Sequence, residues 1–423
     1  MSKSKKIRKS EMSLQPDFTL RRMAVIFIDN IICTLILLFA LNYFSLIFVI
    51  DFLDPIQNTF DDFYLSDIVF SKIRNNDKVP IDSNIIIVNI GNLSRVGIAR
   101  EIEKINSYNP KVIAIDAFFR GEKDKYQDSI LASVLSKIQN FVMVHQLMLD
   151  NGKFAKLIHS AEIFEKYAQP GFANILITDD FQTVRSFSPK ETINNQDQYA
   201  FSVETVRLFD SNSASKFLAR DNSVEIINFR RNQDKYILFD VEDIFSNKRD
   251  LSVVKNKIVI FGFLGPDFST LVAEDNFFTP MNEQYLGKTY PDMYGAIIHA
   301  NCISMILSGD FINIIPSWVN LILLILIIYF NMAFYSYLRI RHDTLFEPLS
   351  ISLVIIEAFF LFILMIIFIY FLKFSIYNNY YKAIFVSFII TPMTFETYHD
   401  SIKPLFISFY QNILLLFGRL NKR

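Results

Sequence analysis

The feature that most constrains this chain is an apolar run near its start, over residues 23–50. From residue 31 onward only Thr34, Asn42 and Ser45 interrupt it. About 20 such residues in a helix cross the ~30 Å hydrocarbon core of a bilayer. A helix also satisfies its own backbone hydrogen bonds there. The run therefore predicts a first transmembrane helix over residues 23–50.

The residues before this run predict its orientation. Seven lysines and arginines precede it, and only Glu11 and Asp17 oppose them. Because cationic flanks stay in the cytosol, residues 1–22 are expected to form a cytosolic basic tail, and the next segment lies outside. A cleaved signal peptide is the alternative. It is disfavoured because the apolar core is too long and no A-x-A site follows it.

Three further apolar runs lie near the end of the chain. They predict transmembrane helices over residues 316–338, 349–372 and 376–398, and residues 399–423 are expected to be a cytosolic amphipathic tail. Arg339 and Arg341 fall in the cytosol if the second span runs inward, which agrees with the first span. The fourth segment contains Pro392 and Glu396 and is just long enough to cross. If it does not span, the tail lies outside.

The middle of the chain, residues 51–315, has the composition of a soluble domain and is long enough to bury a full core. Residues 51–75 predict a stalk helix. Short apolar strands are predicted at 84–91, 111–119, 140–149 and 255–265, and amphipathic helices at 96–105, 128–138, 200–209 and 294–307. This alternation predicts an α/β domain whose mixed, mainly parallel sheet is covered by flanking helices.

Two antiparallel strand pairs are also predicted in this region. Segments 171–180 and 183–189 form one pair across a turn, and segments 224–229 and 235–240 form a hairpin around residues 230–234. Both predictions rest on short apolar segments that are close in sequence and separated by polar residues.

Composition and motifs argue against several classes of function. The net charge of −1 argues against a nucleic-acid partner. The chain contains no P-loop, zincin, serine-hydrolase or kinase signature. Its five histidines show no metal-ligand spacing. We therefore expect no enzyme activity, no cofactor and no metal site.

Polar residues at the carboxyl ends of the predicted strands suggest a ligand site. Ligands of open α/β sheets gather at this edge. Asn89 and Asn92 follow the first strand, Asp116 ends the second, and Asp267 follows the last. These four residues are candidate ligands for a small polar molecule or ion. The alternative is that Asp116 caps neighbouring backbone amides.

Two further residues have both a functional and a structural interpretation. His299 lies on the predicted helix 294–307 and is a candidate ligand residue, although a histidine in this position is more often part of the core. Glu357 lies inside the third predicted span. A carboxylate there is costly, so it either pairs within the helix bundle or transmits a signal between helices.

The order of these segments resembles the CHASE domain of type 2. The matching stretches are LSDIVFSKIR, IIIVNIGNLS, KVIAIDAFF, NKIVIFGFLG, FFTP and MYGAIIHANCISMILSGDF. The last is the most specific, with Gly295, His299, Ala300 and Asn301 in a G-x-x-x-H-A-N arrangement. The resemblance implies a bacterial inner-membrane protein with an extracytoplasmic sensor domain over residues 51–315. Where the family usually has acidic residues after the first strand, this chain has asparagines.

The resemblance also implies a role in signal transduction. Members of the family often end in a cyclase or kinase, whereas only residues 399–423 follow the last predicted span, too few for such a domain. We therefore expect a sensor subunit that relays a small-molecule or envelope signal to a separate partner protein. The alternative is a structural or scaffolding component of an envelope complex. A transporter is disfavoured because few charges lie within the spans.

Overall fold

The chain divides into a helical unit and an α/β unit. In the computed structural model the described residues are 20–47, 65–74, 78–150, 153–175, 183–246, 248–270, 272–282, 290–342, 346–375 and 378–420. The helical unit comprises Met1–Leu53, Ile315–Leu364 and Ile376–Arg423. The α/β unit comprises Asp54–Ile314 and Met365–Ser375. The basic tail expected at residues 1–22 lies almost wholly outside the described residues, as does the stalk helix expected at 51–75 up to residue 64.

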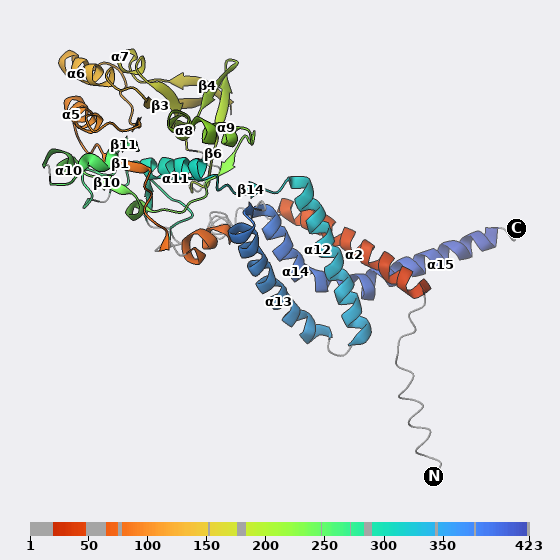
Figure 1. Cartoon of the computed structure of the whole chain (residues 1–423). Helices are drawn as coiled ribbons and strands as arrows, with labels where there is room; N and C mark the ends of the chain where they lie inside the picture. Colours follow the sequence, from red (N-terminus) through yellow and green to blue (C-terminus); the bar gives the residue numbers. More distant parts are fainter. Residues whose placement is uncertain are drawn as a thin grey trace, which may run out of the picture. The chain divides into compact units, whose positions relative to one another are not determined.

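A seven-stranded sheet forms the centre of the α/β unit (Figure 1). Its order is β10 (Ile237–Phe239), β1 (Ile85–Asn89), β11 (Ile258–Gly262), β2 (Val112–Asp116), β3 (Phe141–Asp150) and β4 (Lys153–Ile158), with β5 (Gln169–Phe172) also beside β3. The β3–β4 pair is antiparallel and the other pairs are parallel. The predicted α/β class with a mixed, mainly parallel sheet is therefore confirmed.

Alternate residues of the central strands face two separate cores. Ile85 and Ile87 of β1 face the core that contains α8 (Phe201–Phe209), α9 (Ser211–Leu218) and α11 (Gly295–Ser308). Ile86 and Val88 face the core that contains α5 (Arg95–Asn106), α6 (Lys125–Leu135), α7 (Glu162–Glu165) and α10 (Val241–Ser246). Successive strand residues point to opposite faces, and helices cover both. This is why the strands are apolar throughout.

Smaller elements complete the α/β unit. They are α4 (Leu65–Ile68), η3 (Val69–Ile73), β6 (Ser186–Phe187), β7 (Lys190–Ile193), β8 (Gln196–Tyr199), β9 (Glu225–Ile226), η5 (Gln233–Lys235), η6 (Leu251–Val254), β12 (Asn276–Phe277), β13 (Met293–Tyr294), β14 (Asn313–Ile314), η8 (Ile367–Phe371) and β15 (Phe374–Ser375). Strands β14 and β15 pair in parallel, so the segment before one apolar helix contacts the segment after another.

Both predicted antiparallel pairs are wrong for the described residues. β10 pairs with β1 in parallel, with Ile86 opposite Ile237, and β9 pairs with β6. β5 pairs with β3, and the rest of the segment predicted at 171–180 lies outside the described residues from 176 onward. The apolar β10 gains more by joining the edge of a buried sheet than by pairing with its sequence neighbour.

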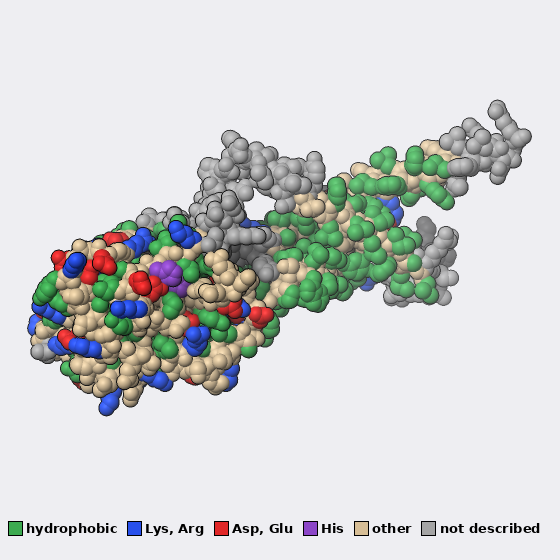
Figure 2. Space-filling model, turned by 90° about the horizontal axis from the view of Figure 1, so that it is seen from above, with side chains coloured by type: hydrophobic (Ala, Val, Ile, Leu, Met, Phe, Trp, Pro, Cys, Tyr) green, Lys and Arg blue, Asp and Glu red, His purple; other side chains and the backbone are tan. Residues whose placement is uncertain are grey.

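The helical unit contains α2 (Leu20–Ile47), α12 (Ser317–Arg341), most of α13 (Phe346–Ile366), α14 (Asn378–Thr397), η9 (Tyr398–Ile402) and α15 (Lys403–Leu420). Within the described residues, three segments are long and apolar enough to cross a membrane, namely Arg22–Asn42, Ser317–Arg341 and Pro348–Phe371. These segments are compatible with a membrane protein. Figure 2 shows apolar side chains covering the helices, whereas charged ones are scattered over the α/β unit.

The fourth predicted span, residues 376–398, is corrected by this result. Its described part forms α14, a helix with asparagines at its start, Lys382 in its second turn and Glu396 near its end. These polar residues leave too short an apolar core. The helix instead packs beside α12 and α2.

Candidate functional site

Three of the strand ends that carry predicted site residues lie side by side. In the sheet register Asn89 of β1 is opposite Gly262 of β11, and Gly262 is opposite Asp116 of β2. All three strands are parallel, so their carboxyl ends meet at one edge. Asn89 and Asp116 are thus separated only by a residue without a side chain.

Asn89 organises this edge. Its buried amide donates to Asp240 Oδ1 at 2.9 Å and to the carbonyl of Gly265 at 3.0 Å. Its Oδ1 accepts from the backbone N–H groups of Gly91 at 3.1 Å and Leu264 at 2.9 Å. One side chain therefore fixes the loops after β1, β10 and β11, which leaves it little capacity for a ligand.

Replacing Asn89 with alanine is expected to destabilise the α/β unit by about 2–4 kcal/mol, because the buried N–H of Leu264 and the partly buried N–H of Gly91 both lose their acceptor. Thermal unfolding of the full chain in detergent, followed by circular dichroism, measures the change. Asn92→Ala is the control, since Asn92 is exposed and should be replaced at almost no cost. Equal melting temperatures for the two variants would contradict the role given to Asn89.

The residues that come closest to a ligand site are Asp116, His299 and Asp275. His299 Nε2, on α11, lies 3.9 Å from Asp116 Oδ2, beyond hydrogen-bonding distance. Phe201 packs edge-on against the imidazole with 5.0 Å between ring centroids. Two predicted ligand residues are therefore brought together from a strand end and a helix.

Asp275 completes this group and was not found from the sequence. It has a φ of 53°, and its backbone carbonyl accepts from Gly295 N at 3.0 Å, at the start of α11. A Cβ on Gly295 would lie 3.1 Å from Asp275 Oδ1, so the glycine of the G-x-x-x-H-A-N motif makes room for this carboxyl group. The available sequence signal was its position two residues before the FFTP stretch.

Burial sets the charges of this group. It raises the pKa of Asp116, and burial together with the neighbouring Asp116 and Glu274 raises the pKa of Asp275. Burial lowers the pKa of His299 to about 4, so its imidazole is neutral at neutral pH. Ionising the two carboxyl groups at this place is costly, and the neutral imidazole does not offset that cost. A ligand that brings positive charge would offset it, so the group favours a cationic ligand.

The other two predicted ligand residues, Asn92 and Asp267, lie apart from this group. Asn92 is exposed. Asp267 Oδ1 accepts from the N–H of Ser269 at 2.8 Å and from its hydroxyl, and these bonds lower the pKa of Asp267. Asp267 thus stabilises its own turn, as short polar side chains commonly do.

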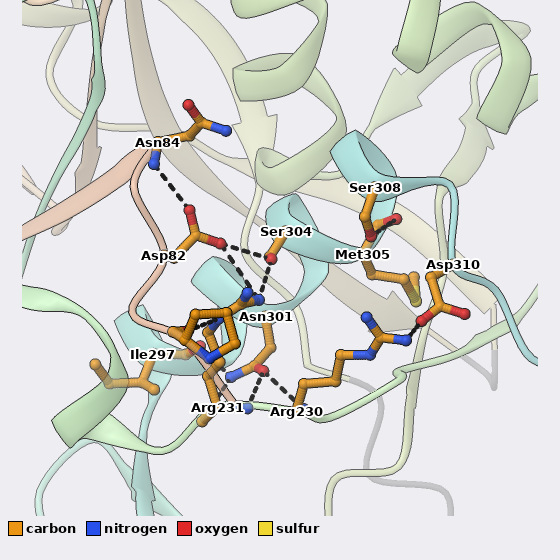
Figure 3. Close-up of polar contacts among 11 residues, drawn as sticks. Asp82, Asn84, Arg230, Arg231, Ile297, Asn301, Ser304, Met305, Ser308 and Asp310 are labelled. Atoms are coloured by element: carbon orange, nitrogen blue, oxygen red, sulfur yellow. Dashed lines mark hydrogen bonds and ion pairs between the residues drawn. The ribbon is translucent and has the colours of Figure 1, made fainter. Parts of the chain in front are cut away.

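The last motif residue, Asn301, forms a structural clamp (Figure 3). Its Oδ1 accepts from the N–H groups of Arg230 and Arg231 at 3.2 Å, and its Nδ2 donates to the Arg231 carbonyl at 2.9 Å. Ser304, one turn later, accepts from Arg231 Nη1 at 2.7 Å and donates to Asp82 Oδ2 at 2.7 Å. α11 is therefore tied to the chain before β1 and before β10.

The described part of the chain contains no group of three His, Cys, Asp or Glu side chains arranged to hold a metal ion. In the helical unit, Glu357 accepts from Asn331 Nδ2 at 3.4 Å, which agrees with the structural interpretation of this carboxylate.

Comparison with known proteins gives one match. A family model described as the CHASE2 domain matches residues 32–333, which is more than half of the chain. No curated protein and no solved structure matches.

Proposed function

Because the chain belongs to the CHASE2 domain family, a family of sensor-type domains, we propose that it is a membrane-anchored sensor without its own catalytic step. Its α/β unit lies outside the cytoplasm of a bacterial cell, with the N-terminus in the cytosol and the apolar helices in the inner membrane. It binds a small polar or cationic ligand at Asp116, Asp275 and His299. It relays the bound state to a separate protein partner.

The observation that carries this proposal is the convergence of two partly buried acids and a buried neutral histidine at the carboxyl edge of the sheet. A cationic ligand would offset the cost of ionising Asp116 and Asp275 in that place. Its binding energy would then depend on pH, because each carboxyl group must lose its proton first.

The position of α11 supports the relay. This helix carries His299 in its first half, and Asn301 and Ser304 clamp its centre. After α11 the chain passes through β14 into the apolar helix α12. A shift of α11 on binding would therefore reach a membrane helix through eight intervening residues, 309–316. Exposed apolar residues of α15, including Leu405 and Phe406, offer a surface for a partner.

Ligand binding is tested by thermal melting of the full chain in detergent with a panel of small amines, amino acids and divalent cations. A true ligand at 100 times its Kd stabilises the protein by about 2.7 kcal/mol. Asp116→Asn and Asp275→Asn should each abolish the shift. The wild-type shift should grow from pH 6 to pH 8.5, because ionisation of both acids becomes easier.

Asp267→Asn is the matched control, since this half-buried acid bonds within its own turn and the shift should survive. The scaffold alternative is favoured by the complete hydrogen bonding of Asn89 at the same edge. If no compound shifts the melting temperature at either pH, the sensor proposal fails and the scaffold is supported.

A further inference from the structure

A second group of charged residues, away from the sheet edge, surrounds Asp310. Arg230 forms an ion pair with the Asp310 carboxylate, and Lys373 Nζ lies 3.7 Å from its Oδ1. Asn228 donates to the Asp310 carbonyl at 2.8 Å and accepts from Arg74 Nη1 at 2.6 Å. Two cations from distant parts of the sequence thus lie at the Asp310 carboxylate, and Asn228 links the backbone of Asp310 to a third, Arg74. We name Arg74, Arg230 and Lys373 the cationic cluster.

The cationic cluster carries more positive charge than its described surroundings neutralise. Burial and then Arg230 lower the pKa of Arg74 to about 10. Burial and then Arg74 and Arg230 lower the pKa of Lys373 to about 8. Arg74 is 92% buried, and its Nη2 has no hydrogen-bond acceptor among the described residues. The three cations repel one another, and one of them has a buried N–H group without an acceptor. An anion bound there would stabilise this arrangement.

One member of the cationic cluster, Arg230, lines a small pocket. The other residues around this pocket include Asn228, Arg231, Ser304, Ser308 and Asp310. Arg230 is 36% exposed, and Figure 3 shows its guanidinium extended toward Asp310 at the end of α11. Arg231 is not counted in the cluster because its charge is already paired. Its guanidinium forms an ion pair with Asp82 and donates a hydrogen bond to the Ser304 hydroxyl.

The chain connections indicate which anion is available there. Lys373 comes two residues after the apolar segment Pro348–Phe371, and Asp310 comes seven residues before the apolar helix α12. Phe371, Leu372 and Phe374, beside Lys373 in sequence, are 69%, 51% and 40% exposed. A lysine beside exposed apolar side chains at the end of an apolar helix is typical of the membrane–water interface, because its charged end reaches the headgroups while its neighbours stay among the lipid chains. These features favour a lipid over a free solute.

We propose that Arg74, Arg230 and Lys373 bind the phosphate of an anionic phospholipid headgroup, with the neighbouring aromatic side chains among the lipid chains. The phosphate of a bound lipid would supply the hydrogen-bond acceptor that Arg74 Nη2 lacks and would offset the repulsion among the three positive charges. The site is independent of the ligand site at Asp116, so one can fail without the other.

The test uses the full chain in nanodiscs of phosphatidylcholine alone or with phosphatidylglycerol. We expect phosphatidylglycerol to raise the melting temperature and to remain bound in native mass spectrometry. Lys373→Gln should weaken lipid retention about tenfold, the usual effect of losing one charge-assisted contact. Asp310→Asn should strengthen it, because the competing acid is removed. If Asp310 had only a structural role, Asp310→Asn would not increase lipid retention.

Lys255→Gln is the control, since this lysine is exposed elsewhere on the α/β unit. A further arm adds inorganic phosphate to the phosphatidylcholine nanodiscs. Equal stabilisation by phosphate and by lipid would overturn the assignment to a headgroup. Equal retention by wild type, Lys373→Gln and Asp310→Asn would overturn the site itself.

Discussion

Replacing Gly262 with alanine should destabilise the α/β unit by about 3 kcal/mol. Gly262 ends the central strand β11, and a Cβ built on it lies 2.6 Å from the Cβ of Ala296 on α11. Carbon atoms in proteins pack at roughly 3.5–4.0 Å, so either the strand or the helix must move. Overpacking of this kind costs about 1–3 kcal/mol, and here both positions, Gly262 and Ala296, are buried, which favours the upper end.

A second substitution separates this clash from other effects. Ala296→Gly removes the opposing methyl group, so the double variant Gly262→Ala/Ala296→Gly should be more stable than Gly262→Ala alone. The helical glycine itself costs about 1 kcal/mol. Gly97→Ala is the comparison, because its close contacts all belong to one side chain in a turn, that of Leu93, with 2.9 Å to Cδ2 and 3.0 Å to Cβ, and not to a strand packed on a helix. Additive effects in the double variant, measured by thermal melting, would contradict direct contact between the two positions.

Gly262 lies in the part of the sheet that the sequence predicts well, namely its central parallel strands. Continuous apolar runs at 84–91, 111–119 and 255–265 predicted buried parallel strands, and β1, β2 and β11 lie next to one another. Such runs are informative because a strand covered on both faces needs apolar side chains at every position. The convergence of Asn89 and Asp116 at one edge then follows from parallel order alone.

Other features depend on contacts between distant segments, which local patterns do not specify. β10 was predicted to pair with a neighbour in sequence, yet it joins β1, about 150 residues earlier in the chain. Asp275 reaches the site from a loop, without a periodic pattern to mark it. The prediction of a fourth span was wrong because the segment is long enough to cross a membrane but carries polar residues at both ends, which shorten its apolar core.

Glu101 is a further residue whose environment the sequence did not reveal. It lies on α5, where its side chain is completely buried and neither carboxylate oxygen has a hydrogen-bond partner among the described residues. Burial first, and the charge of Asp240 second, raise the pKa of Glu101 to about 8. In the unfolded chain its pKa would be about 4.3.

This difference makes stability depend on pH. The folded protein holds a proton on Glu101 that the unfolded chain releases, so this contribution to stability is complete below pH ~4.3 and is lost as pH rises to about 8. The slope approaches 1.4 kcal/mol per pH unit, which amounts to several kcal/mol across the window. Glu101→Gln, which cannot ionise, should therefore melt at a clearly higher temperature than wild type at pH 8, with the difference vanishing near pH 4.5.

Glu103→Gln, on the same helix, is the matched control, because Glu103 is 60% exposed and pairs only loosely with Lys137 at 3.5 Å. Its melting temperature should follow that of wild type at every pH. The difference between Glu101→Gln and wild type isolates Glu101 from Asp116 and Asp275, whose raised pKa values act in the same direction in both proteins. A constant difference across pH 4.5–8 would mean that Glu101 stays ionised when folded. Since Asp240 both raises the pKa of Glu101 and accepts from Asn89, a titrating Glu101 would also connect the protonation of this core to the loops at the sheet edge.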